Sequence, residues 1–91
     1  MTTALVMEDD GTSHEVELSR NSLASDSVYC FIDNSTKSIY IWLGKKAGVR
    51  KRFVGAQTAS NLRSANGFSY KVKSLDEGSE PSNFLNFIVS E

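Results

Sequence analysis

The sequence predicts an α+β domain in which a mostly antiparallel central sheet of about five strands is sandwiched between one long and one short helix. Three observations support this prediction. Short runs with strand character fill the first half of the chain, and a helical pattern extends from about residue 47 to residue 65. One further strand and a short apolar stripe at helical spacing then complete the chain.

The first four strands are predicted as two hairpins. Asp10-Gly11 is a turn signal between the first two runs, and the polar stretch 34–37 supplies turn residues between the second two. The four runs are residues 3–7, 14–19, 27–33 and 38–44.

The fourth run is apolar on both faces. Ile39 and Ile41 alternate with Tyr40 and Trp42, so successive side chains point to opposite sides of the sheet. A strand with two apolar faces needs cover on both sides, and we therefore expect it to be central.

The long helix is expected to end at Asn66-Gly67, a pair that favours helix termination. A wheel drawn at about 100° per residue separates an inward from an outward face. The inward residues are predicted to be Gly55, Ala56, Ala59 and Leu62. The outward residues are predicted to be Arg50, Val54, Gln57 and Asn61, flanked by Phe53 and Ser64.

The last third of the chain predicts an edge strand and a short helix. The strand begins near residue 68, and its apolar side chains alternate with Ser69, Lys71 and Lys73. Pro81 favours the first turn of a helix. The predicted buried side chains are Phe68, Tyr70 and Val72 on the strand and Phe84, Phe87 and Ile88 on the helix.

Length and composition predict a single domain, residues 1–91, located in the cytoplasm. The formal net charge is -1, which gives no overall attraction to nucleic acid. Cys30 is the one cysteine, which excludes an internal disulfide and fits a reducing compartment. No apolar run approaches the roughly 18 residues of a membrane span.

Five basic residues gather where the long helix begins, near the positive end of its dipole, where cations are disfavoured. They are Lys45, Lys46, Arg50, Lys51 and Arg52. Three interpretations remain open: a solvated surface, contact with an acidic protein surface, and contact with phosphoinositide head groups.

The residues give no support for catalysis. Cys30 is expected to be buried and inert, and His14 to be solvated on a hairpin strand. Metal clusters, phosphate-binding glycine loops and paired catalytic carboxylates are absent from the sequence. We therefore expect a binding module without a metal or cofactor, and not an enzyme.

Four stretches together resemble the repeat of the gelsolin, villin and severin family. They are "HEVELSRNSL" (14–23), "SLASDSVYCFID" (22–33), "IYIWLGKKAG" (39–48) and "EGSEPSNF" (77–84). The resemblance implies a gelsolin-like fold and an actin-binding module associated with the cytoskeleton.

The resemblance also implies how actin would be bound. In the family the long helix enters the cleft at the barbed end of actin, and monomer sequestration or capping is expected here more than severing. The implied actin-binding residues are Lys46, Val49, Arg50, Phe53, Val54, Gln57, Thr58 and Asn61. Two alternatives stay open, namely phosphoinositide binding by the basic cluster and a partner other than actin.

The family's calcium sites do not match this sequence. Relatives use an Asp directly before the first central strand and a Glu on the long helix, where this chain has Ser27 and Lys51. A second site in some relatives uses an Asp that aligns near Arg63. We therefore expect calcium-independent behaviour, with the Lys51 ammonium in the place of the ion, against Asp26.

Overall fold

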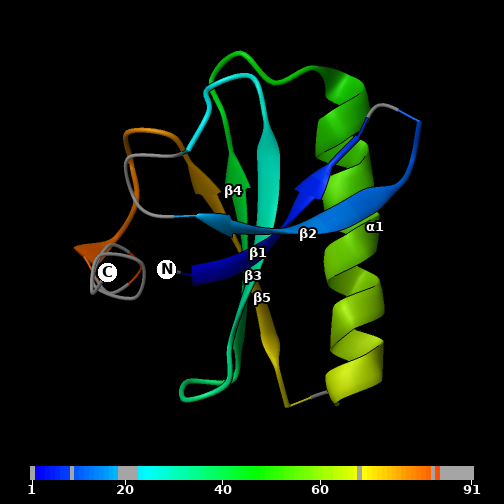
Figure 1. Cartoon of the computed structure of the whole chain (residues 1–91). Helices are drawn as coiled ribbons and strands as arrows, with labels where there is room; N and C mark the ends of the chain where they lie inside the picture. Colours follow the sequence, from blue (N-terminus) through cyan, green and yellow to red (C-terminus); the bar gives the residue numbers. More distant parts are fainter. Residues whose placement is uncertain (1, 9, 19–22, 68, 83, 85–91) are drawn as a thin grey trace.

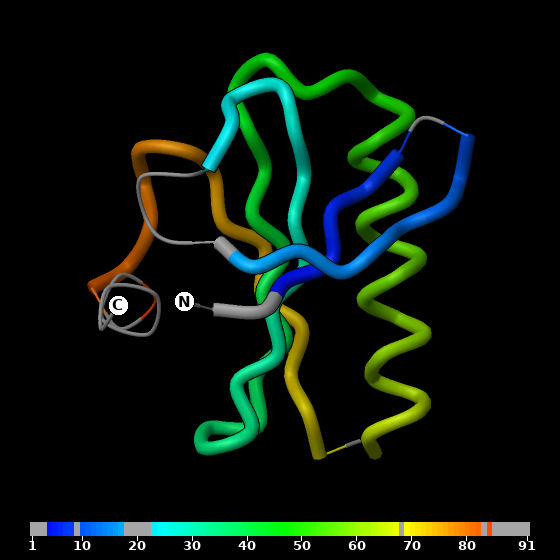
Figure 2. Tube along the Cα trace, viewed as in Figure 1, coloured from blue at the N-terminus to red at the C-terminus, as the bar shows by residue number. Residues whose placement is uncertain are grey.

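The computed structural model describes residues 2–8, 10–18, 23–67, 69–82 and 84, which form a five-stranded sheet and one long helix (Figures 1 and 2). The sheet order is β2-β1-β3-β4-β5, and every neighbouring pair is antiparallel except β4–β5. This confirms the predicted fold class. The elements are β1 (Thr2–Met7), β2 (Ser13–Leu18), β3 (Val28–Asp33), β4 (Ser38–Leu43), α1 (Val49–Asn66) and β5 (Lys71–Asp76).

The two hairpins are joined through a short junction. Strands β3 and β4 pair along their whole length, as do β1 and β2. By contrast, β1 and β3 are paired only at Leu5↔Cys30 and Val6↔Tyr29. In Figures 1 and 2 the β1–β2 hairpin crosses the other strands steeply, and its tip lies beside the first half of α1.

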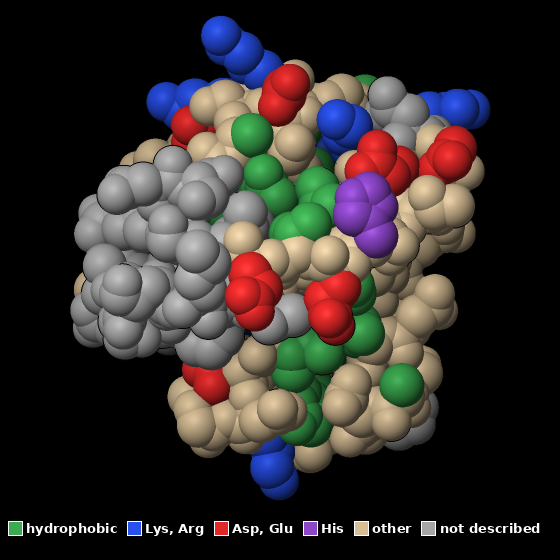
Figure 3. Space-filling model, in the orientation of Figure 1, with side chains coloured by type: hydrophobic (Ala, Val, Ile, Leu, Met, Phe, Trp, Pro, Cys, Tyr) green, Lys and Arg blue, Asp and Glu red, His purple; other side chains and the backbone are tan. Residues whose placement is uncertain are grey.

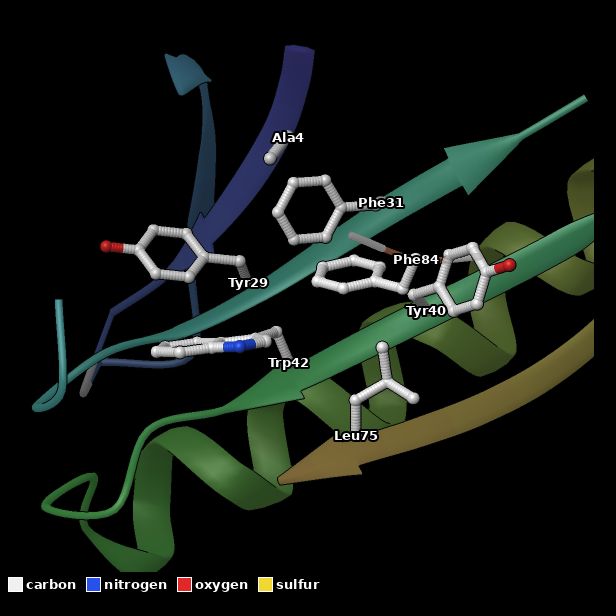
Figure 4. Close-up of a cluster of buried hydrophobic side chains, with 7 residues drawn as sticks. All are labelled: Ala4, Tyr29, Phe31, Tyr40, Trp42, Leu75 and Phe84. Carbon is white, nitrogen blue, oxygen red and sulfur yellow. The ribbon is translucent and has the colours of Figure 1, made fainter. Parts of the chain in front are cut away.

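The core lies on both sides of the sheet, as the alternation in β4 predicted. The cluster on the α1 side consists of Met7, Val28, Cys30, Ile39, Ile41, Val54 and Ala59. The cluster on the opposite side, drawn in Figure 4, consists of Ala4, Tyr29, Phe31, Tyr40, Trp42, Leu75 and Phe84. Phe84 packs edge-on against Phe31 and Tyr40, with ring centroids 5.3 Å and 5.2 Å apart.

Helix α1 packs closely on the sheet through small residues. A Cβ atom added to Gly55 would lie 2.7 Å from Val28 Cγ1, a separation that real Cβ atoms do not show. Ala59 is fully buried one turn later. The backbone of the helix therefore approaches β3 directly, and glycine is the residue that allows this approach.

The helical wheel was wrong at two positions. Val54 was predicted to point outward, but its side chain is 6% exposed and belongs to the core on the α1 side. Ala56 was predicted to point inward and is exposed. Val54 is buried because it lies in a cluster with Met7 of β1 and Val28 of β3, and a wheel cannot include such long-range packing.

The strand after α1 also differs from its prediction. It begins at Lys71, pairs in parallel with β4, and leaves Val72 40% exposed, while Leu75 is its buried residue. Leu75, near the end of the strand, lies opposite Trp42. The predicted short helix, with Phe87 and Ile88, and the predicted strand residue Phe68 lie outside the described residues.

Candidate functional site

The outer face of α1 presents exposed apolar side chains. Val49 is 84% exposed and Phe53, one turn further, is 61% exposed. Polar exposed residues continue the same face through Gln57 and Asn61, whereas Thr58 is half-buried. We call Val49, Arg50, Phe53, Gln57 and Asn61 the helix crest. Large apolar side chains in water on one helix face indicate a surface that contacts a partner.

A shallow hollow of about 220 Å³ adjoins the helix crest, between α1 and the tip of the β1–β2 hairpin. Its lining residues are Asp10, Gly11, Arg50, Phe53, Val54 and Gln57. Asp10 accepts hydrogen bonds from the Thr12 hydroxyl at 2.6 Å and the Thr12 backbone N–H at 3.0 Å. These bonds lower the pKa of Asp10 and fix a charged carboxylate at the rim.

The five basic residues near the start of α1 do not form one free patch, because two of them bind nearby carbonyl groups. Lys51 Nζ donates to the backbone oxygen of Asp26 at 3.2 Å. Arg52 donates to the backbone oxygens of Ala47 at 3.3 Å and Gly44 at 3.2 Å. Both side chains therefore tie the first turn of the helix to the loops before β3 and after β4.

Lys45, Lys46 and Arg50 are the exposed members of the basic cluster. Arg50 belongs to the helix crest. Lys45 and Lys46 lie on the loop before α1, where their charges contribute to lowering the pKa of Glu77. The structure thus divides the predicted basic patch between the helix crest and this loop.

Glu77 joins the same loops from the end of β5, and sequence reasoning assigned it no role. Its carboxylate accepts hydrogen bonds from the Lys45 backbone N–H at 2.9 Å and the Ser25 hydroxyl at 2.7 Å. The bond from Lys45 is the main cause that lowers the pKa of Glu77, and the Ser25 bond adds to it. The only sequence signal was that Glu77 opens the stretch "EGSEPSNF".

Glu80 and Gly44 give a physical reason for two further motif positions. Glu80 accepts the indole N–H of Trp42 at 2.7 Å and the Gly78 backbone N–H at 3.0 Å. A Cβ atom on Gly44 would lie 2.1 Å from the backbone oxygen of Ser25, so only glycine fits between these loops. The motifs thus hold together the end of the sheet from which α1 starts.

The sequence pattern "Gelsolin repeat" matches residues 13–85. The chain belongs to the gelsolin-repeat family. This match covers the strands β2–β5 and the whole of α1, and it confirms the resemblance drawn from the four motifs.

Two solved structures contain a protein of similar fold. The chain is similar to a protein in the crystal structure of the Thorarchaeota ProGel/rabbit actin complex, with a TM-score of 0.89 and 31% identity over 97% of this chain and 99% of that chain. It is also similar to a protein in the Thorarchaeota 2DGel3/rabbit actin complex, with a TM-score of 0.77 and 29% identity, and it spans 43% of that chain. No curated protein matches the chain.

The calcium site that the gelsolin family implies does not fit the residues of this repeat. Calcium requires several oxygen ligands. Here the Lys51 ammonium, which has no oxygen, donates to the backbone carbonyl of Asp26 at 3.2 Å. Within the described part of the chain, no group of three or more His, Cys, Asp or Glu side chains could hold a metal ion.

Cys30 and His14 lie apart from the helix crest. Cys30 is buried, and its thiol donates to the Gly55 carbonyl at 3.5 Å. Burial raises the pKa of the Cys30 thiol to about 12. His14 is exposed on β2, with Nε2 3.4 Å from a Glu8 carboxylate oxygen.

Among the described residues, no helix is long and apolar enough to cross a membrane.

Proposed function

We propose that this gelsolin repeat is an actin-binding module, not an enzyme, and that it inserts the helix crest into the barbed-end cleft of actin. The exposed Phe53 is the observation that supports the proposal most directly. Burying such a side chain contributes roughly 1.5–3 kcal/mol, and aromatic anchors often dominate an interface. The likeness to a repeat from an actin complex over nearly the whole chain points to the same partner.

The proposed contact surface follows the sequence prediction with one change. It comprises Lys46, Val49, Arg50, Phe53, Gln57, Thr58 and Asn61. Val54 lies beneath this surface, because it is buried in the core cluster on the α1 side. The hollow beside Phe53 gives room for an apolar side chain of the partner, with Arg50 and Asp10 at its rim.

Binding is proposed to be independent of calcium, because Lys51 supplies a fixed positive charge beside Asp26. A domain with one helix crest has one main contact surface, so monomer sequestration or barbed-end capping is favoured over severing. The phosphoinositide alternative has weaker support, since Lys51 and Arg52 are already bonded to backbone carbonyls.

Titration of actin with the wild-type protein and with Phe53→Ala tests the proposal. We expect Phe53→Ala to lose about 2 kcal/mol of binding free energy, a roughly thirtyfold weaker Kd. Val72→Ala is the matched control, because it also truncates an exposed apolar side chain but lies on β5, away from the helix crest. Equal actin affinity of the wild-type protein and Phe53→Ala would remove the helix crest from the site.

Polymerisation assays on the same samples distinguish the modes of action. Sequestration or capping predicts less filament or slower growth without new filament ends. Rapid fragmentation of filaments, seen by microscopy at low protein-to-actin ratios, would contradict this part of the proposal.

A further inference from the structure

The two edges of the sheet carry opposite charges. The edge strand β2 exposes Glu15 and Glu17, and the edge strand β5 exposes Lys71 and Lys73. Figure 3 shows the acidic side chains gathered over β2 and the β1–β2 hairpin. Charges on an edge strand usually prevent pairing with another sheet. Here each edge repels its own copy, but the two edges attract one another.

The charged pairs lie on opposite faces of the sheet. Glu15 is directly opposite Leu5, which packs against the core cluster on the α1 side, so Glu15 and Glu17 share the α1 face. Lys73 is directly opposite Tyr40, and its Nζ lies 5.9 Å from the Tyr40 ring centroid, so Lys71 and Lys73 share the other face.

The alternation of the backbone is compatible with pairing between these edges. The N–H groups of Lys71 and Glu77 donate to carbonyls on the β4 side. Because the direction of the backbone groups alternates along a strand, the even-numbered residues of β5, including Val72, direct their N–H and C=O groups away from the sheet. At the hairpin, Glu8 N–H donates to the Thr12 carbonyl. Even-numbered residues of β2 therefore bond to β1, and Glu15 and Glu17 direct their backbone groups outward.

We propose that β2 of one molecule pairs in parallel with β5 of a second molecule. The register places Glu15 opposite Lys71, Val16 opposite Val72 and Glu17 opposite Lys73 of the second copy. When two residues lie directly opposite in a parallel pair, one directs its backbone N–H and C=O groups toward the other strand and the other directs them away. This register meets that condition, because the backbone groups of Glu15 and Val72 point outward and those of Lys71 and Val16 point into their own sheets. Within one sheet β2 and β5 run in opposite directions, so the second molecule must be turned over for its β5 to run parallel to β2 of the first. After this turn the lysines of the second molecule and the glutamates of the first lie on the same face of the joined sheet.

The contact is heterologous, because it joins two different edges. The pair still offers one free β5 edge on the first molecule and one free β2 edge on the second, so the same contact extends into rows of molecules. Exposed ion pairs are individually weak and are screened by salt. The assembly is therefore concentration-dependent and favoured at low ionic strength.

Sedimentation velocity over a range of protein concentrations tests the proposal. At about 0.01 M salt, where the Debye length is about 30 Å, we expect the wild-type sedimentation coefficient to rise with concentration, and at about 1 M salt to stay constant. A wild-type protein that remains monomeric at low salt would overturn the proposal.

Charge reversal provides complementary variants. In the double variant Glu15→Lys/Glu17→Lys both edges of the sheet are basic, and in the double variant Lys71→Glu/Lys73→Glu both edges are acidic. Because like charges repel, each variant alone should associate at least about tenfold more weakly than the wild type. Mixing the two variants should restore association. A mixture that remains monomeric would refute the pairing. Because the two variants also carry net charges of opposite sign, Val72→Pro is needed to separate edge pairing from general attraction.

Val72→Pro tests the backbone contact without changing any charge. Because the Val72 N–H faces away from β4, proline removes no bond within the sheet. We expect the variant to melt as the wild type does but to remain monomeric at low salt. Phe53→Ala should associate like the wild type, which separates this contact from the proposed actin surface. Normal association of folded Val72→Pro would exclude edge pairing.

Discussion

Phe53 and Val54 are neighbours in sequence but have opposite surroundings, since Phe53 is exposed and Val54 is buried in the core cluster on the α1 side. We expect Val54→Ala to lower the free energy of unfolding by about 1–3 kcal/mol, because it leaves a gap in the core. Phe53→Ala should change it by less than about 1 kcal/mol, because an outward side chain leaves no cavity. Urea melts of both variants measure the difference, and the reverse order would contradict the assigned orientation.

Cys30 should be unreactive in the folded protein. With a pKa of about 12 the thiol carries very little thiolate near pH 8, and its side chain is only 2% exposed. A thiol reagent should therefore label the native protein far more slowly than the urea-unfolded protein. Equal labelling rates in the two states would show that β3 is accessible to solvent.

The loops between elements depend on Glu77. Its pKa is lowered in the folded state, so its contribution to stability is present above the unfolded pKa of about 4.3 and is lost as pH falls through the folded pKa. Glu77→Gln should therefore melt at a lower temperature than the wild type at pH 7, and the two melting temperatures should converge in acid. Glu15→Gln, which removes an exposed carboxylate from β2, is the control. A difference that is constant from pH 7 to pH 3 would exclude this role.

At the scale of elements, local sequence predicted what depends on neighbouring residues. Alternation in β4 predicted two buried faces, and Asn66-Gly67 predicted the end of α1. The helical pattern predicted the helix that carries Phe53, and the family resemblance implied that this helix contacts actin. The orientation of Val54 and the role of Glu77 were missed, because each depends on contacts between segments distant in sequence.

Across the whole molecule, the tie between Lys51 and Asp26 predicts that calcium leaves stability unchanged. A ligand bound only to the native state would add about 2.7 kcal/mol at one hundred times its Kd. We expect no rise in melting temperature in millimolar calcium relative to chelator, and no change in actin affinity. Lys51→Glu is the informative variant, since a response to calcium in this variant alone would identify Lys51 as the excluding group. A calcium-dependent rise in the wild type would contradict the prediction.

The junction between β1 and β3, with its two residue pairs, sets how the fold can open. Few backbone bonds join the first hairpin to the β3–β4–β5 part of the sheet, whereas β3 and β4 are paired throughout. We therefore expect two units of unequal protection against amide hydrogen exchange, with the first hairpin in the less protected one. Because its tip lines the hollow beside Phe53, opening of this unit reshapes the surface next to the helix crest while the rest of the sheet stays closed.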